Sequence, residues 1–299
     1  MFIAGVKTVP QPETDLLRRL VAYGELTKPR IAALVLAVAV AGFWVGSAGT
    51  PDPRRLAGTI LGVALLAGGI FALNQHFERH LDGVMRRTEN RPLPAGRITP
   101  AESLRFGWTL SVAGLAVLGA TTNLLSAAVG TVTLASYLFI YTPLKTKTPH
   151  CTLIGAFPGA APPLLGWVAA RGQLSVEAWA LFAILFFWQF PHFHSIALLY
   201  RDDYARANIR LWTVVDPGGA MVGRQIVGFT LLLLPASLAP ALLGMGGPVY
   251  GCGAAILGLA FLFLSVRTAR AKSRVEAQRL LLASVLYLPV LLALLVLNK

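Results

Sequence analysis

The fold is decided by the stretch from Leu56 to Asp82, LAGTILGVALLAGGIFALNQHFERHLD. It opens with an apolar run of about 20 residues, the length at which a helix crosses a bilayer. The run ends in three hydrogen-bond acceptors spaced four apart, Asn74, Glu78 and Asp82. Four residues turn a helix by about 400°, so these three side chains share one face. The stretch therefore predicts a membrane helix that carries a polar face at its end.

Arginines and prolines follow this helix at once, in the sequence GVMRRTENRPLP from Gly83 to Pro94. Carboxylates on one face suit Mg²⁺, which proteins usually hold together with substrate phosphates. The planar guanidinium groups of Arg87 and Arg91 suit phosphate oxygens. A solvated helix end or a basic loop beside a membrane also carries charges, but the single acceptor face favours a diphosphate–metal site. Its place at the membrane edge predicts a lipid-soluble substrate.

The composition is that of a membrane protein. The chain has 299 residues, of which 56% are hydrophobic and 13% charged, and its mean hydropathy is +0.66. Soluble domains carry about 25% charged residues. The net charge of +13 lies mainly in short connections between apolar runs, so it indicates membrane topology and no nucleic-acid partner is expected. Cys151 and Cys252 form neither a disulfide framework nor a zinc pattern.

The apolar runs predict an all-α polytopic fold of nine transmembrane helices. We expect residues 1–30 to form a cytoplasmic tail and residues 31–299 a single membrane domain, with two four-helix halves (about 31–142 and 152–266) and a ninth helix. The predicted spans are 31–48, 56–76, 103–121, 124–141, 152–170, 176–199, 221–243, 248–266 and 280–297. One side of the membrane receives 22 of the 26 lysines and arginines. This bias predicts a multi-pass protein of a bacterial-type plasma membrane, with its N-terminus in the cytoplasm and its C-terminus outside.

Small residues and prolines predict how the spans pack. Glycines spaced four apart permit close helix contacts; the pairs are Gly42 and Gly46, Gly58 and Gly62, and Gly155 and Gly159. Pro158, Pro162 and Pro163 predict a kink in the fifth span, because proline removes a backbone donor.

Further candidate residues lie in the later loops and in the sixth span. Lys145, between the fourth and fifth spans, suits a leaving diphosphate. His192 and His194 lie in an aromatic, apolar segment, where neutral imidazole is a ligand type for haem iron, although a hydrogen-bonded structural histidine is the commoner explanation. His76 and His80 lie on the face of the second span opposite the acceptors. Of the adjacent acids Asp202 and Asp203, only one can face a site, and we select Asp203.

The chain resembles the UbiA superfamily of intramembrane prenyltransferases, and within it the haem O synthase branch. The resemblance runs from Thr27-Lys28-Pro29-Arg30 to the last helix and is most specific between Asn74 and Arg97. Glu78 stands where the superfamily usually has aspartate, and a glutamate at this position is similar to the haem O synthase branch. Further agreement comes from Tyr141-Thr142, Pro162-Pro163, Trp188-Gln189, Pro191-His192-Phe193 and Tyr200-Arg201. Cys151 and Arg210-Leu211-Trp212 depart from the branch.

The resemblance implies farnesyl transfer from farnesyl diphosphate to a vinyl group of haem B, with addition of water, giving haem O for haem–copper oxidases. It implies that Asn74, Glu78 and Asp82 are catalytic and that Arg87, Arg91 and Lys145 bind the diphosphate. Mg²⁺ would be held by Glu78, Asp82 and Asp203, and haem B, a substrate, by His192 or His194. Membrane lipid and a haem A synthase are expected partners. The alternatives are a UbiA-type enzyme with a quinone-precursor acceptor, and a transporter, which would place its ionisable residues near the bilayer midplane.

Overall fold

The computed structural model describes residues 12–216 and 218–299, and over these residues its regular secondary structure consists of helices joined by turns and loops, with no strand. Within that range nine helical segments are long and apolar enough to cross a membrane. They are α2 (Pro29–Gly46), α3 (Pro53–Val84), α4 (Pro100–Thr121), α5 to α6 (Leu124–Leu144), α7 to α8 (Cys151–Arg171), α9 (Val176–Leu199), α12 (Ala220–Leu242), α13 (Pro248–Ala271) and α14 (Arg274–Leu297). The prediction of nine transmembrane helices is confirmed, and the orientation of the termini stays a prediction.

Helix α3 is the longest of the nine because it extends beyond its apolar run at both ends. Asp52 caps its start by accepting hydrogen bonds from the backbone amides of Arg54 and Arg55. At the other end the helix continues to Val84. Glu78 and Asp82 are therefore helical residues and not part of a loop, as the spacing of the acceptors predicts.

Two of the spans are interrupted. The fourth consists of α5 (Leu124–Ala135), a π-helical turn η1 (Ser136–Tyr141) and the short α6 (Thr142–Leu144). The hydroxyl of Thr142 donates to the carbonyl of Tyr137 within this wider turn, and π-turns inside helices often mark functional sites. The fifth span divides at Ala160 into α7 (Cys151–Gly159) and α8 (Ala161–Arg171), at the proline cluster that predicts a kink.

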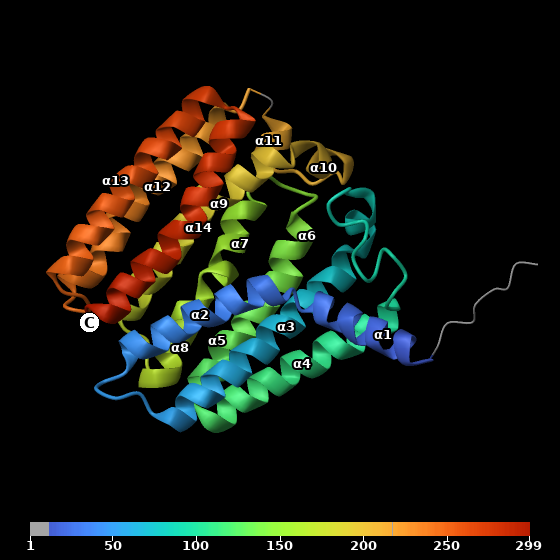
Figure 1. Ribbon diagram of the computed structural model, residues 1–299, viewed down its shortest axis with the longest axis horizontal. Coiled ribbons are helices and arrows are strands. Elements are labelled where there is room, and N and C mark those ends of the chain that lie inside the picture. Colours follow the sequence, from blue (N-terminus) through green and yellow to red (C-terminus); the bar gives the residue numbers. More distant parts are fainter. Residues whose placement is uncertain (1–11, 217) are drawn as a thin grey trace, which may run out of the picture.

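Three helices lie outside the nine spans. Helix α1 (Pro12–Leu26) occupies much of the segment for which the sequence predicts only a tail. The short helices α10 (Arg201–Arg206) and α11 (Trp212–Val215) form the connection between α9 and α12. Since Arg210 donates its amide to the carbonyl of Lys145 at 2.8 Å, this connection lies against the loop that follows α6 (Figure 1).

Close helix contacts depend on glycine where the sequence predicts them. Helix α2 packs on α8, and α3 on α4. A Cβ on Gly42 would lie 2.2 Å from the carbonyl oxygen of Pro163, and one on Gly58 would lie 1.9 Å from the Thr121 hydroxyl. Both distances are far below van der Waals contact, so only glycine permits these approaches.

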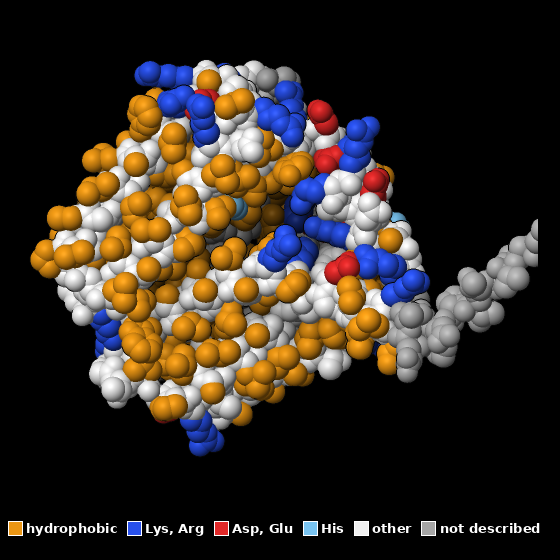
Figure 2. All heavy atoms as spheres, viewed as in Figure 1, with side chains coloured by type: hydrophobic (Ala, Val, Ile, Leu, Met, Phe, Trp, Pro, Cys, Tyr) orange, Lys and Arg blue, Asp and Glu red, His pale blue; other side chains and the backbone are white. Residues whose placement is uncertain are grey.

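The helices leave a hollow in one face of the molecule. Figure 2 shows it between the group α12 to α14 and the group α2 to α4, lined mainly by hydrophobic side chains. Lysine and arginine side chains gather along its edge on the side of α1 and α6 (Figure 2). The hollow thus joins an apolar space to a basic rim.

Candidate active site

The three acceptors of α3 are buried although two of them carry charge. Asn74 and Asp82 are each 1% exposed and Glu78 is 8% exposed. A buried carboxylate is costly unless a cation or hydrogen-bond donors accompany it. The face is therefore not a solvated helix end, and each of its members needs a partner.

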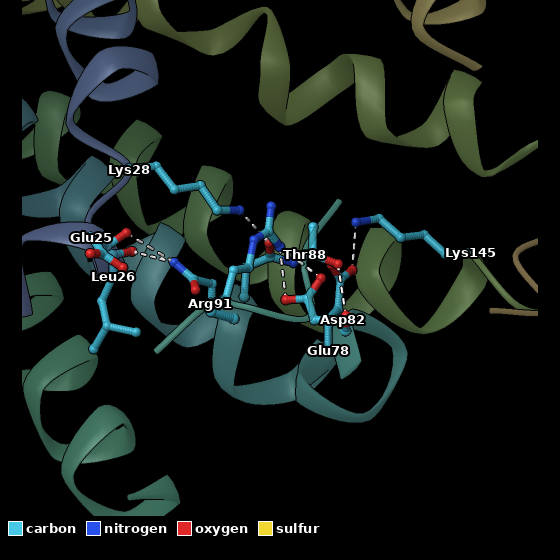
Figure 3. Close-up of polar contacts among 10 residues, drawn as sticks. Glu25, Leu26, Lys28, Glu78, Asp82, Thr88, Arg91 and Lys145 are labelled. Carbon is cyan, nitrogen blue, oxygen red and sulfur yellow. Dashed lines mark hydrogen bonds and ion pairs between the residues drawn. The ribbon is translucent and has the colours of Figure 1, made fainter. Parts of the chain in front are cut away.

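Each acceptor has one cation as its partner, and each cation comes from a different part of the chain (Figure 3). The Lys28 ammonium donates to Asn74 Oδ1 at 3.0 Å. The Lys145 ammonium lies 2.5 Å from Glu78 Oε1. Arg91 Nη1 lies 2.7 Å from both carboxylate oxygens of Asp82. The face thus holds three acceptors and three basic groups at one end of α3.

Lys28 reaches the site from the turn between α1 and α2. Its backbone is left-handed, with φ 48°, a conformation that costs energy for a residue other than glycine. The turn is tied to α3 because the Gln75 amide donates to the carbonyls of Glu25 and Leu26. Burial, followed by the nearby charge of Arg91, lowers the pKa of Lys28 from 10.5 to about 7.

Lys145 follows the interrupted fourth span. Its ammonium lies 4.5 Å from the centre of the Tyr141 ring, which ends η1. Gly155 of α7 leaves room for that ring, since a Cβ there would lie 2.5 Å from it. Burial lowers the pKa of Lys145, but the carboxylate of Glu78 outweighs this and raises it well above 10.5. Lys145 is therefore a fixed positive charge.

Arg91 is positioned by the loop between α3 and α4. The Thr88 hydroxyl donates to the Asp82 carbonyl at 2.8 Å, which folds the loop back onto the end of α3. Farther along, Arg97 forms an ion pair with Glu25 at 2.6 Å, and this hydrogen-bonded pair raises the pKa of Arg97. The loop therefore joins the end of α3 to the turn that carries Lys28.

Arg87 lies apart from the carboxylates. It is exposed, and its guanidinium lies over the rings of Tyr200 and Tyr204, 5.2 and 6.0 Å from their centres. The sequence alone does not separate it from Arg91, because both arginines belong to the same basic loop. A role in diphosphate binding stays a prediction for Arg87.

The second acidic segment packs against the same loop. Asp203 is buried and Asp202 is exposed. The Asp203 carboxylate pairs with Arg206 and accepts the backbone amide of Arg86 at 3.3 Å. Across residues 12–216 and 218–299, His, Cys, Asp and Glu form no group of three that could hold a metal ion. The acidic side chains of the described residues are thus too few to hold a cation alone, and they suit one only where a bound phosphate supplies further oxygens.

The two candidate haem ligands differ in which ring nitrogen is available. The Ser284 hydroxyl donates to the Leu281 carbonyl at 2.6 Å, so it accepts from His192 Nδ1, 2.8 Å away. That bond leaves a lone pair on Nε2 of His192. His194 is buried, and its Nε2 lies 2.6 Å from the side-chain amide oxygen Oε1 of Gln225, so this nitrogen carries a proton and donates it. His192 is half-buried and stacks on Trp188.

Lys28 is the residue at the site that the sequence analysis does not select. Its basic neighbour Arg91 and the amide side chain of Gln75 line a pocket of about 370 Å³ with it. The Nδ2 atom of Asn74 is buried and has no hydrogen-bond partner among residues 12–216 and 218–299, so it is available to a ligand. The sequence shows only a lysine before Pro29, and it is the tertiary fold that brings Lys28 to Asn74.

Among the described residues, nine membrane-capable helices with a buried group of carboxylates and basic side chains beside an apolar hollow define an intramembrane protein, and the chemistry of that group suits an anionic, lipid-soluble ligand. The sequence profile of the UbiA prenyltransferase family matches residues 35–291, and the chain belongs to this family. It is 49% identical over 286 residues to a protoheme IX farnesyltransferase of Solibacter usitatus, covering 93% of this chain and 98% of the relative. It is 45% identical to one of Koribacter versatilis, covering 97% and 96%.

Solved structures share the fold. A structure of digeranylgeranylglyceryl phosphate synthase matches with a TM-score of 0.79 at 16% identity, over 94% of this chain and 98% of that chain. A UbiA homolog from Archaeoglobus fulgidus bound to GPP and Mg²⁺ matches with a TM-score of 0.67 at 14% identity, over 92% and 99%. At these identities the likeness concerns the fold alone.

Proposed function

We propose that the chain transfers a farnesyl group from farnesyl diphosphate to a vinyl group of haem B. The allylic C–O bond breaks and diphosphate leaves. The terminal vinyl carbon forms the new C–C bond, and water adds its hydroxyl to the other vinyl carbon while its proton is released. The product is haem O, for use in haem–copper oxidases. The name of the curated relatives supports the two substrates, and the pairing of three acceptors with three cations at the end of α3 carries the proposal.

The donor set suits Mg²⁺. Glu78 and Asp82 offer carboxylate oxygens from one buried face, and Asn74 would support them with its unpartnered Nδ2 toward the substrate. When bound, Mg²⁺ would supply neutralisation of the diphosphate as it leaves. Asp203 forms no group of three acids with Glu78 and Asp82 among the described residues, so it would contribute to a second metal position beside the loop that it contacts through the amide of Arg86.

Lys28, Arg91 and Lys145 would bind the phosphate oxygens. Each is within hydrogen-bond distance of an acceptor on α3, so each can turn from that acceptor to a bound phosphate without leaving the site. Fixed cations beside the departing oxygens stabilise the charge that develops there. Arg87 would act at the outer edge, where its present contacts are the two tyrosine rings.

The acceptor haem would occupy the apolar hollow, with its iron on Nε2 of His192. The hydrogen bond from Nδ1 to Ser284 fixes the required tautomer, as partners of metal-binding histidines usually do. His194 would instead stabilise the packing of α9 on α12 through Gln225. The apolar walls exclude water from the allylic cation until the C–C bond has formed. We also propose that the protein lies in a bacterial plasma membrane with its N-terminus in the cytoplasm. It would deliver its product to a haem A synthase.

The test is an assay of purified protein in detergent with haem B, farnesyl diphosphate and Mg²⁺, in which the haem product is weighed by mass spectrometry. A haem heavier by one hydroxyfarnesyl unit is the expected result. Prenylation of a quinone precursor with no haem product would overturn the acceptor and retain the diphosphate site. His192→Ala should abolish the shift of the haem absorption spectrum on binding, whereas His194→Ala should keep it. The reverse pattern would contradict the choice of His192.

A further inference from the structure

A second basic site lies between α12 and α13, away from the residues assigned above. The structure has an open groove of about 620 Å³ where α12 begins and α13 ends. Arg224, Arg270 and Lys272 contribute three cations to it, and the described residues that line it include no aspartate or glutamate. Figure 2 shows basic side chains gathered at this end of the helix pair.

The rest of the groove is apolar and faces outward. Val227, Leu231 and Val266 form its wall below the cations, and Leu231 is 49% exposed. Arg224 and Leu231 are seven residues apart on one helix, which is about 10 Å along its axis. The groove therefore passes from a basic end at the membrane edge to an apolar wall at acyl-chain depth.

Two glycines shape the groove. A Cβ on Gly223 would meet Ala269 at 3.3 Å, so this residue allows α12 and α13 to approach each other. A Cβ on Gly228, one and a half turns farther along α12, would meet nothing within 4 Å. Gly228 therefore leaves empty space along the apolar wall, where it would lie beside a bound chain.

We propose that this groove binds an anionic phospholipid, with the phosphate among Arg224, Arg270 and Lys272 and an acyl chain along Val227 and Leu231. Charge complementarity selects the ligand, because three cations without an acid favour a headgroup with net negative charge. Basic pockets between membrane helices on the cytoplasmic side are suited to such headgroups. The apolar wall favours a lipid over free phosphate. The bound lipid would hold α12 against α13, and through α12 the packing of α9.

The experiment is native mass spectrometry of the purified full-length protein titrated with dioleoyl phosphatidylglycerol or dioleoyl phosphatidylcholine. These lipids have the same tails and differ in net charge. We expect one phosphatidylglycerol to be retained at concentrations at which phosphatidylcholine is not. The triple variant Arg224→Gln, Arg270→Gln and Lys272→Gln should weaken that binding at least tenfold. Arg274→Gln removes an exposed cation two residues after Lys272 that does not line the groove, so this variant should leave the binding unchanged.

A second variant tests the groove without changing its charge. Gly228→Leu fills the empty space beside the wall and replaces glycine with a better helix former, so it should weaken phosphatidylglycerol binding while the protein stays folded by circular dichroism. Equal binding to both lipids would overturn the proposal, as would an equal loss in Arg274→Gln, since diffuse surface charge would then explain the binding. Displacement of phosphatidylglycerol by millimolar inorganic phosphate would also overturn it, since the groove would then be a phosphate site.

Discussion

Lys28 gives the site a dependence on pH near neutrality. Burial and the charge of Arg91 lower the pKa of Lys28 to about 7, so in the free protein this group loses its charge as the pH rises through 7. Diphosphate binds the charged form. The affinity for farnesyl diphosphate should therefore fall above pH 7. Lys28→Arg should remove this dependence, because guanidinium stays charged.

The size of the effect follows from the pKa. With a pKa of about 7, the charged fraction of Lys28 is about nine-tenths at pH 6 and about one-tenth at pH 8. If only the charged form binds, the dissociation constant rises about tenfold over that range. Loss of the last proton from the diphosphate strengthens binding as the pH rises, so it has the opposite sign.

The pH dependence of the free energy of unfolding that comes from Lys28 also has the opposite sign to that of the affinity. Between pH 7 and the ordinary value of 10.5, the unfolded chain binds more protons at Lys28 than the folded chain. The contribution of this group to stability therefore increases with pH. A weaker affinity at pH 8 thus cannot come from destabilisation through Lys28.

The assay is the dissociation constant of farnesyl diphosphate with Mg²⁺ and without haem, so that no turnover occurs, at several pH values from 6 to 8.5. Lys147→Arg is the matched control, since Lys147 is an exposed lysine of the loop that carries Lys145. It should keep the wild-type profile. A flat profile in the wild-type protein, or the same slope in Lys28→Arg, would refute the reasoning.

Three further predictions concern the same site. Chelation of Mg²⁺ should abolish turnover while the thermal unfolding temperature changes little, because the carboxylates have partners without the metal; unfolding on chelation would contradict this. Asp82→Ala should lower the rate of the reaction about 10²-fold or more in a single-turnover assay, while gel filtration shows that the variant is still inserted and folded. Normal activity of this variant would remove Asp82 from the site. Gly155→Ala should lower kcat about tenfold or more by displacing the Tyr141 ring, which a Cβ would meet at 2.5 Å. Gly119→Ala, where the nearest contact is 3.6 Å, is its control and should retain activity.

The sequence predicts what depends on local periodicity. The nine spans follow from runs of apolar residues, and the common face of Asn74, Glu78 and Asp82 follows from helix geometry. Neither requires knowledge of distant contacts. The proline cluster predicts a kink in the fifth span in the same way, although the position of the break at Ala160 depends on how α7 and α8 pack.

What depends on tertiary contacts could not be predicted. Lys28 meets a residue 46 positions away, through a left-handed backbone that Gln75 ties to α3. Arg87 and Arg91 lie in the same basic stretch of sequence, yet Arg87 lies over tyrosine rings whereas Arg91 binds Asp82. Helix α1 escapes prediction because its segment is polar and mixed in charge, without the length or hydropathy of a membrane span.

The one-to-one pairing on α3 has a consequence for how the site can change. Glu78 with Lys145 and Asp82 with Arg91 are two ion pairs whose members neutralise each other, whereas Asn74 is neutral and binds Lys28 by a hydrogen bond alone. A magnesium diphosphate carries the complementary charges, with a cation for the carboxylates and anionic oxygens for the basic groups. Its arrival is then an exchange of counter-ions that leaves no charge stranded. Replacing one member alone strands a buried charge, which costs more than replacing both. A protein of this fold that lacks one of Glu78 and Lys145 should therefore also lack the other.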